Sequence, residues 1–328
     1  VLADVGGTNT RVALSHGADL QRDSIRRYRN TDYDGIGAVL RDYVQDNGLK
    51  PQAACVAVAG PVRDGAGQLT NISWHIDRDT VHAATGAETV AVLNDLQAQG
   101  HALGRIAPEY LTELLPGAPA SAQAARLVIG VGTGMNAAPV FRLGDRTLVP
   151  PAEAGHATLP VKTEEELSLM RYVGAEHGAA GVEDVISGRG FERVYAWLCA
   201  ERGAGTGSGS YADTGATAPK SAAEIMAAME TGSDPLAREA VHVFSRILGR
   251  VCGDLALINL PFGGIYLVGG VARHFGPHLL SCGFAEAFAD KGRFHDFMKQ
   301  FHVSLVSDDY AALTGCASHL LEQAEMRG

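Results

Sequence analysis

The sequence predicts an α/β protein of two lobes, because one small device occurs twice along the chain. Residues 1–14 and 127–140 each carry an apolar run, a glycine-containing turn with Thr or Asn, and a second extended run. The chain also has 328 residues, which is more than a single hydrophobic core comfortably serves. Both observations favour a duplicated unit, with one copy of the device at the start of each half.

A strand follows the glycines in both copies of the device. Residues 11–15 and 137–142 are extended runs, and further turns follow at 17–19 and 144–145. A P-loop or a dinucleotide-binding fingerprint would instead open a helix after its glycines. The device is therefore predicted to be a glycine-turned β-hairpin. Two such hairpins, offering backbone N–H groups from two sides, suit a phosphate chain held between two lobes.

Short apolar runs and one helical repeat define the rest of the first half. They predict three strands within residues 1–30, a helix over 36–47, and buried strands over 53–59 and 88–93. The last of these strands delivers Asn94 and Asp95 at its carboxyl end. That end of a parallel strand is where α/β sheets place ligands. The first lobe is therefore predicted as β-β-β-α-β-α-β, a mixed five-stranded sheet flanked by helices.

The second half repeats this order from residue 127 and adds further helices. The predicted elements are helices over 164–176, 182–200, 221–231, 235–259 and 310–324, with strands over 264–268 and 303–306. Between 203 and 220 the chain is rich in small and polar residues, which is typical of a mobile surface loop. We expect a small lobe of residues 1–105 plus 306–328, a large lobe of 106–305, and a cleft between them.

Composition argues against several classes of partner. The chain has 27 Lys and Arg against 37 Asp and Glu, and the formal charge of −10 disfavours nucleic acid and an anionic membrane surface. No run approaches the ~18 apolar residues of a membrane span, and no signal peptide is visible. The five cysteines are scattered without a C-x-x-C pair, as expected for free thiols in a reducing compartment. The expected location is the cytoplasm.

A series of short segments, taken in order, carries a family resemblance over nearly the whole chain. The segments are residues 4–9, 59–61, 69–74, 93–95, 132–134, 153–156, 183–188, 266–270 and 284–294. With them the chain resembles the bacterial-type ATP-dependent glucokinases. One glycine-rich turn alone would be weak support, but this ordered set at compatible spacings is specific. The resemblance implies the two-lobed actin-like ATPase (ribonuclease H-like) fold of the hexokinase, actin and Hsp70 superfamily.

Two details set the chain apart from relatives of this family. The repressor and open-reading-frame sugar kinases carry a cysteine-rich zinc motif after the sugar-binding His, whereas His156 here precedes Ala-Thr-Leu-Pro and the next cysteine is Cys199. We therefore expect no zinc. Ala154 stands where the family commonly has Gly, which adds one methyl group beside the implied sugar pocket.

Asp95 is the predicted general base. Transfer of a phosphoryl group to a sugar hydroxyl needs a carboxylate within hydrogen-bond reach of that hydroxyl. An Asp with an ordinary pKa of about 4 is already ionised at pH 7, so only its placement is demanding. From the residues alone, Asp95 could equally be the N-cap of a helix. The resemblance favours the catalytic role.

The resemblance implies a sugar-binding set of Asn94, Glu153, His156 and Glu183, with Asn71 as a weaker candidate. Carboxylates accept two hydroxyl protons, while Asn and His can donate or accept. Two alternatives remain from the residues alone. Glu153 and His156 could be metal ligands, although no third ligand follows at a suitable spacing. Glu183 could be an acid in the first turn of a helix.

The two glycine turns and one later glycine pair are the implied ATP site. The residues are Gly6, Gly7, Thr8 and Asn9 from one lobe, Gly132, Thr133 and Gly134 from the other, and Gly269 and Gly270 near the adenosine. Asp4 would orient water on Mg²⁺ without binding the ion directly. From the residues alone, the turns could be plain hairpins and the glycine pair a simple strand-to-helix turn.

Together these implications predict a glucokinase that uses ATP and Mg²⁺, binds glucose between its lobes and closes to exclude water. A homodimer is the family expectation. Three alternatives stay open: a kinase for another hexose or an amino sugar, a non-catalytic sugar sensor, and an acyl-phosphate kinase. Asp95 argues against the sensor. Glu153, His156 and Glu183 would have no purpose in the acyl-phosphate kinase.

Overall fold

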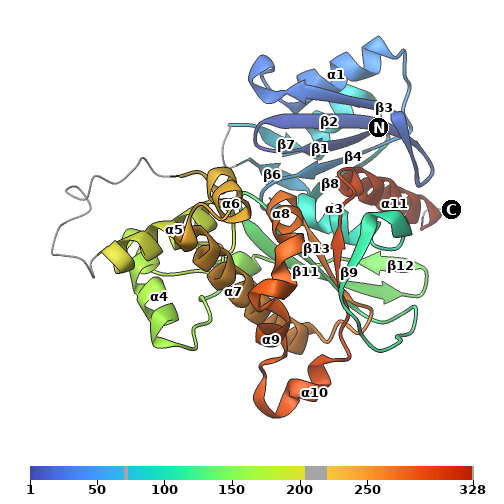
Figure 1. The fold of residues 1–328 in the computed structure, drawn as a ribbon. Coiled ribbons are helices and arrows are strands. Elements are labelled where there is room, and N and C mark those ends of the chain that lie inside the picture. Colours follow the sequence, from blue (N-terminus) through green and yellow to red (C-terminus); the bar gives the residue numbers. More distant parts are fainter. Residues whose placement is uncertain (70–72, 204–219, 327–328) are drawn as a thin grey trace. The chain divides into compact units, whose positions relative to one another are not determined.

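The computed structural model describes residues 1–69, 73–203 and 220–326 (Figure 1). The chain divides into two compact units. The first consists of Val1–Tyr110, Ala138–Pro151 and Asp308–Gly328, and the second of Leu111–Ala137 and Ala152–Ser307. Residues 138–151 thus group with the first unit, whereas the sequence-based boundaries put them in the large lobe. Most of the loop predicted between 203 and 220 lies outside the described residues.

The first unit is built on the predicted mixed sheet of five strands. Its order is β3 (Asp19–Arg29), β2 (Asn9–His16), β1 (Leu2–Val5), β4 (Ala53–Val58), β8 (Thr89–Asn94). The pairs β3·β2 and β2·β1 are antiparallel, and β1·β4 and β4·β8 are parallel. The adjacent strands β1 and β4 are almost wholly apolar because helices cover both faces of the sheet.

Alternate residues of these strands supply two separate cores. One core packs α1 (Ile36–Asp46) and α2 (Arg78–Thr85) against residues such as Val5 and Val56. The other packs α11 (Ala311–Glu325) and the start of α3 (Asp95–Ala102) against residues such as Leu2 and Leu93. The C-terminal helix therefore completes the face of a sheet whose strands all come from the first hundred residues (Figure 1).

α3 and α11 lie side by side at the closest helix contact in this unit (Figure 1). Gly315 of α11 meets the backbone of α3, and a Cβ there would lie 3.1 Å from the amide nitrogen of Ala102. One turn along, Nδ1 of His319 lies 3.2 Å from Nε2 of buried His101. The helix that begins at Asp95 therefore packs directly against α11.

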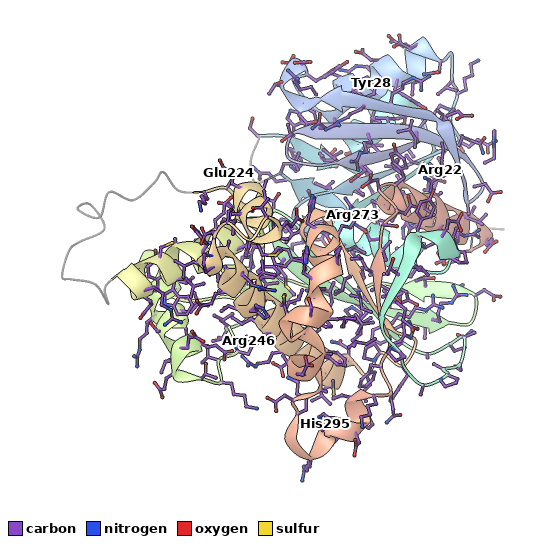
Figure 2. All side chains as sticks on the ribbon, in the orientation of Figure 1. Arg22, Tyr28, Glu224, Arg246, Arg273 and His295 are labelled. Carbon is purple, nitrogen blue, oxygen red and sulfur yellow. The ribbon has the colours of Figure 1, made fainter. Side chains whose placement is uncertain are left out.

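An ion pair and aromatic contacts also hold the C-terminal residues against the rest of the first unit. Arg22 of β3, labelled in Figure 2, bonds the carboxylate of Asp308 at 3.0 Å. Its guanidinium lies 5.0 Å from the ring centre of Tyr110 and 5.4 Å from that of Tyr310. The planar cation therefore combines an ion pair with two cation–π contacts.

A small antiparallel sheet follows β4 and was not predicted. It consists of β5 (Val62–Arg63), β6 (Ala66–Gln68) and β7 (His75–Asp77). Its strands are two or three residues long, so they leave little periodic signal in the sequence. Asn71, a predicted sugar contact, falls in the connection between β6 and β7 and lies outside the described residues.

The second sheet has six strands, one more than expected. Its order is β12 (Arg146–Leu148), β11 (Met135–Leu143), β10 (Arg126–Val131), β13 (Ile265–Val268), β14 (Val303–Val306), β9 (Leu111–Leu115). The pairs β10·β13 and β13·β14 are parallel, and β9 is the unpredicted strand, antiparallel to β14. The division between the two units falls inside β11, at Ala137.

Helices α4 to α10 belong to the second unit. They are α4 (Glu164–His177), α5 (Gly188–Gly203), α6 (Ala222–Glu230), α7 (Pro235–Asn259), α8 (Gly270–Leu279), α9 (Phe284–Ala289) and α10 (His295–Met298). The long α7 begins at the N-cap Asp234, which accepts bonds from two backbone amides, and has Pro235 as its first residue. Phe191, Phe244 and Phe275 pack edge to face and tilted in the core beside it.

One predicted helix boundary in this unit was wrong. The sequence predicted a helix from residue 182, but α5 begins at Gly188. Val182 and Glu183 instead donate their amides to the carbonyls of Ala157 and Gly155, at 2.9 and 2.8 Å. Pairing with a distant segment therefore overrides the local helical spacing of residues 182–187.

No helix in the described residues is long and apolar enough to cross a membrane. All five cysteines carry free thiols, and four of them are buried.

Candidate active site

In the first unit, the predicted site residues meet at one edge of the sheet. β1, β4 and β8 are parallel, and Val5 is opposite Val58, which is opposite Asn94. The glycine turn that follows Val5 and the Asn94–Asp95 pair therefore leave the sheet at the same edge. Carboxyl ends of parallel strands form the usual ligand site of such sheets.

Asn94, and not Asp95, caps the helix that follows β8. Its side-chain oxygen accepts the amide of Leu96 at 2.9 Å, while the side chain of Gln97 accepts the amide of Asn94 at 3.1 Å. The carboxamide nitrogen of Asn94 donates to the carbonyl of Gly60 at 2.9 Å. This is a complete capping box. Asn94 is therefore largely committed to the backbone around it, which weakens its candidacy as a sugar contact.

Asp95 is the first residue of α3 and is half-buried. One carboxylate oxygen accepts the amide of Leu96 at 2.8 Å. The helix N-terminus places partial positive charge beside the carboxylate. Asp95, the predicted general base, therefore presents its carboxylate at the ligand edge of the sheet.

The first glycine turn is held by a residue that the sequence did not single out. The amide of Gly6 donates to the carbonyl of Asn9 at 3.0 Å. Buried Asn30 donates its side-chain amide to the carbonyl of Gly6 at 2.8 Å, and its backbone amide donates to the carbonyl of Thr8 at 2.9 Å. Thr10 in turn donates to the side chain of Asn30 at 2.8 Å. The turn therefore has a defined shape rather than a loose loop.

Asp4 lies on β1 just before this turn. Burial raises the pKa of its carboxyl group, and Arg11, whose guanidinium lies 3.3 Å away, opposes that rise. The same guanidinium donates to the carbonyl of Asp309 at 3.1 Å. A single carboxylate with one oxygen facing Arg11 fits a water-mediated contact to Mg²⁺, an ion that keeps much of its hydration. The described residues contain no group of three His, Cys, Asp or Glu side chains able to hold a metal directly.

In the second unit, the second glycine turn is bonded to a predicted sugar ligand. The amide of Gly132 donates to the carbonyl of Gly134 at 2.8 Å, and the amide of Gly188 donates to the carbonyl of Gly132 at 2.9 Å. The amide of Met135 donates to Oε2 of Glu183 at 2.9 Å. A Cβ on Gly134 would lie 3.1 Å from the carboxyl carbon of Glu183 and nearer still to Oε2. A side chain at 134 would therefore displace this carboxylate from its bond to the amide of Met135.

Hydrogen bonds between two backbone segments bring the predicted sugar-binding residues of this unit together. Besides the bonds of Val182 and Glu183 described above, the amide of Leu159 donates to the carbonyl of Ala180 at 3.0 Å. Glu153 and His156 are exposed and Glu183 is half-buried. Because α5 begins only at Gly188, the interpretation of Glu183 as a first-turn helix acid was wrong.

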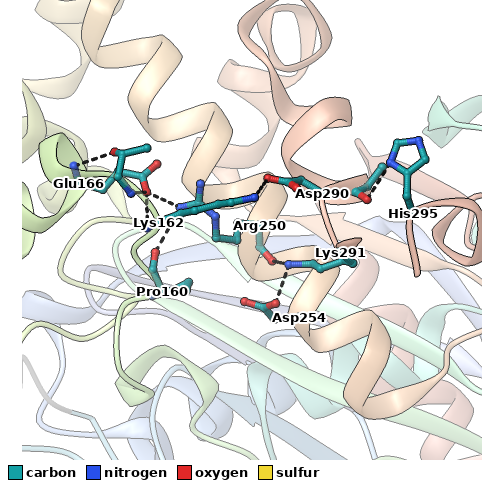
Figure 3. Close-up of polar contacts among 10 residues, drawn as sticks. Pro160, Lys162, Glu166, Arg250, Asp254, Asp290, Lys291 and His295 are labelled. Carbon is teal, nitrogen blue, oxygen red and sulfur yellow. Dashed lines mark hydrogen bonds and ion pairs between the residues drawn. The ribbon is translucent and has the colours of Figure 1, made fainter. Parts of the chain in front are cut away.

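A buried ion pair anchors the chain that follows His156. Arg250 of α7 donates to Oε2 of Glu166 at 2.7 Å and to the carbonyl of Pro160 at 3.4 Å (Figure 3). Burial raises the pKa of Glu166, but the bonds from Arg250 and from the amides of Lys162 and Thr163 outweigh it and hold that pKa below its usual value. The loop is thereby fixed to the longest helix of the unit.

The same network continues from α7 to the segment after α9 (Figure 3). Lys291 donates to Asp254 at 2.6 Å and to the carbonyl of Arg250 at 3.2 Å. Lys162 pairs with Asp290. Residues of the predicted motif over 284–294 therefore have a structural role, next to the Arg250–Glu166 ion pair that holds the loop after His156.

Gly269 and Gly270 follow β13 at the same sheet edge as the second glycine turn, because β10 and β13 are parallel. Gly269 has a positive φ of 102°, and a Cβ there would lie 2.9 Å from the carbonyl carbon of Val131. Gly270 opens α8, and a Cβ on it would meet nothing within 4 Å. The first glycine is needed for packing, and the second leaves space at a helix N-terminus.

Comparisons with known proteins identify the family of the chain. The sequence profile of the glucokinase family matches residues 1–323. The glucokinase of Saccharophagus degradans is 31% identical over 326 residues, covering 98% of this chain and 97% of its own length.

Two solved structures resemble the fold. The crystal structure of a glucokinase from an Antarctic psychrotroph is 28% identical, with a TM-score of 0.82 and 98% of both chains covered. That of a ROK family glucokinase from Streptomyces griseus in complex with glucose and AMPPNP is 20% identical, with a TM-score of 0.62 and 98% of both chains covered, which supports the fold alone. The match over almost the entire chain, together with the two glycine turns and the residues around them, shows that this chain belongs to the glucokinase family.

Proposed function

We propose that this protein transfers the γ-phosphoryl group of ATP to the 6-hydroxyl of D-glucose, giving glucose 6-phosphate and ADP. The observation that carries this proposal is the placement of Asp95 at the same sheet edge as the first glycine turn. A carboxylate and a phosphate-binding turn at one edge are what phosphoryl transfer to an alcohol requires.

Asp95 acts as the general base in this proposal. Its ionised carboxylate accepts the proton of the 6-hydroxyl while the hydroxyl oxygen forms a bond to the γ-phosphorus. The bond from that phosphorus to the bridging oxygen breaks, and ADP leaves. The N-terminus of α3 places partial positive charge beside this carboxylate.

The remaining site residues hold the two substrates. Glu153, His156 and Glu183 bind the sugar hydroxyls, with one oxygen of Glu183 already accepting the amide of Met135. Asn94 and Asn71 are weaker sugar contacts. The two turns and the glycine pair bind ATP: Gly6, Gly7, Thr8, Asn9, Gly132, Thr133, Gly134, Gly269 and Gly270. A protein of the same fold, the ROK family glucokinase from Streptomyces griseus, was crystallised in complex with glucose and AMPPNP.

Mg²⁺ is the proposed metal, reached from Asp4 through water. When bound, the ion neutralises charge on the β- and γ-phosphates. We also propose a cytoplasmic homodimer. The free thiols suit a reducing compartment, and the dimer is checked by light scattering after size exclusion.

A coupled assay of ADP release over a panel of hexoses tests the activity, with ATP, ADP and polyphosphate as donors. We expect glucose with ATP to give the highest kcat/KM. Preference for another hexose or an amino sugar would redirect the substrate assignment. Glucose binding without turnover would instead identify a sugar sensor.

A further inference from the structure

Asn136, the second residue of β11, hydrogen-bonds the backbone on both sides of Glu153. Its side-chain nitrogen donates to the carbonyl of Ala152. Its side-chain oxygen accepts the amide of Ala154 at 2.9 Å and also the amide of Ala137 at 2.7 Å. Asn136 lies in the second copy of the glycine-turn device, but no role was predicted for it.

The two bonds to residues 152 and 154 have the pattern of a strand pair. In a parallel ladder, one residue bonds the carbonyl of the residue before and the amide of the residue after its partner on the neighbouring strand. Among side chains, only Asn and Gln carry a donor and an acceptor side by side in this way. The carboxamide of Asn136 therefore replaces a strand neighbour for Glu153 and limits the direction of its side chain.

The residue before Asn136 holds the other carboxylate of the set. Met135 donates its amide to Glu183, as described above. Its carbonyl packs against Gly155, where a Cβ would lie 3.0 Å from the Met135 carbonyl carbon and nearer still to the oxygen. Two consecutive residues of one strand thus bind the backbone around Glu153 and the side chain of Glu183, and the close contact at Gly155 leaves little room for either to shift.

We propose that Asn136 is a positioning residue for the hexose, which sets Glu153 at a fixed spacing from Glu183. This inference rests on the proposed function, because it takes both carboxylates as sugar ligands. Asn136 itself touches neither substrate in the proposal. It acts by restricting where the Glu153 carboxylate meets the sugar hydroxyls, so its loss should weaken glucose binding.

Asn136→Ala tests the proposal, with glucose and ATP kinetics measured for the full chain. Removing both bonds frees the Glu153 segment, so the KM for glucose is expected to rise about tenfold or more. The KM for ATP and kcat should change by less than about threefold. Asn136→Asp should raise the glucose KM at least as much, because a carboxylate still accepts from Ala154 but has no proton to donate to Ala152.

Asn259→Ala is the matched control, because it also removes one side-chain amide bond, to the carbonyl of Leu255 at the end of α7. Its kinetics should equal those of the unsubstituted chain. Hydrogen exchange of a peptide covering 152–157 gives a readout independent of activity, and only the substitutions at Asn136 should speed it. An active Asn136→Ala enzyme with an unchanged glucose KM, or with equal losses in kcat and both KM values, overturns the inference. An unsubstituted chain that phosphorylates no hexose refutes the proposed function instead.

Discussion

Replacing Gly315 by Ala tests whether the close packing of α3 against α11 fixes the position of Asp95. In an isolated helix this substitution stabilises by about 1 kcal/mol. Here the new Cβ would lie 2.6 Å from the carbonyl carbon of Ala98 and 3.1 Å from the amide nitrogen of Ala102. Non-bonded carbons rest about 3.5–4.0 Å apart, and main-chain atoms cannot rotate aside. Because the carbonyl oxygen of Ala98 would lie nearer still to the new Cβ, the two helices must separate by more than about 1 Å.

The cost follows from that separation. Overpacking of a tight contact costs about 1–3 kcal/mol, and opening the core around Leu313 and Cys316 adds lost burial. After the helical gain, we expect a net loss of about 2 kcal/mol, which lowers Tm by about 4–8 °C for a unit of this size. Because Asp95 is the first residue of α3, kcat should also fall, by up to about 10²-fold.

Gly37→Ala in α1 of the same unit is the control. Its Cβ would meet side-chain atoms of Arg41 and Thr80 at 3.4 Å, an ordinary contact. This variant should match or exceed the original Tm, with unchanged kcat. Thermal scans and initial rates decide the matter. A Gly315→Ala protein as stable as Gly37→Ala would refute the packing argument, and a destabilised one with normal kcat would refute the link to Asp95.

Three further predictions concern charge. Asp95→Asn should lower kcat by about 10²–10⁴-fold while calorimetry still detects glucose binding; near-normal turnover would end the assignment. Glu166→Gln should cost about 3–5 kcal/mol at pH 7 by leaving Arg250 buried and unpaired. Because the pKa of Glu166 is lowered on folding, its contribution is present above its ordinary pKa of 4.5 and lost as pH falls below it, so urea midpoints of the variant should depend less on pH there. Burial, and then the neighbouring His319, lowers the pKa of His101 from 6.5 to about 3, so the unfolded chain binds the proton first and stability falls as pH drops from about 6.5 towards 3. His101→Phe should flatten that fall, and an unaltered slope would show that His101 does not control it.

The elements predicted correctly from the sequence are those encoded by their own local pattern, including the 25-residue α7. The β1–β2 hairpin is predicted by the glycines of its turn, and β4 is predicted by one unbroken apolar run. β9 was missed because it is defined by its pairing with β14, which lies far along the chain, and its five residues show no strand alternation. The start of α5 was misplaced for the same reason, since a distant segment captures Glu183.

The site divides in a similar way. The residue types and their order pointed to a sugar and a phosphate chain, with the roles supplied by the family resemblance. The residues that hold the site in place could not be predicted from the sequence. Side chains such as Asn30 and Asn136 bond backbone groups that lie 16 to 24 residues away along the chain. Nothing in the local pattern distinguishes these asparagines from surface ones. The capping role also went to Asn94 rather than Asp95, because β8 continues through Asn94 before the helix begins.

The position of α11 in the chain has a consequence for synthesis on the ribosome. The sheet of the first unit and α3 are complete by residue 102, but the helix that covers their shared face begins at Ala311. At 5–20 residues per second, the roughly 200 intervening residues take about 10–40 s to emerge. During that time Leu2, Cys55 and Leu93 have no partner from α11. A nascent chain stalled before Ala311 should therefore be a preferred client of chaperones that bind exposed apolar strands.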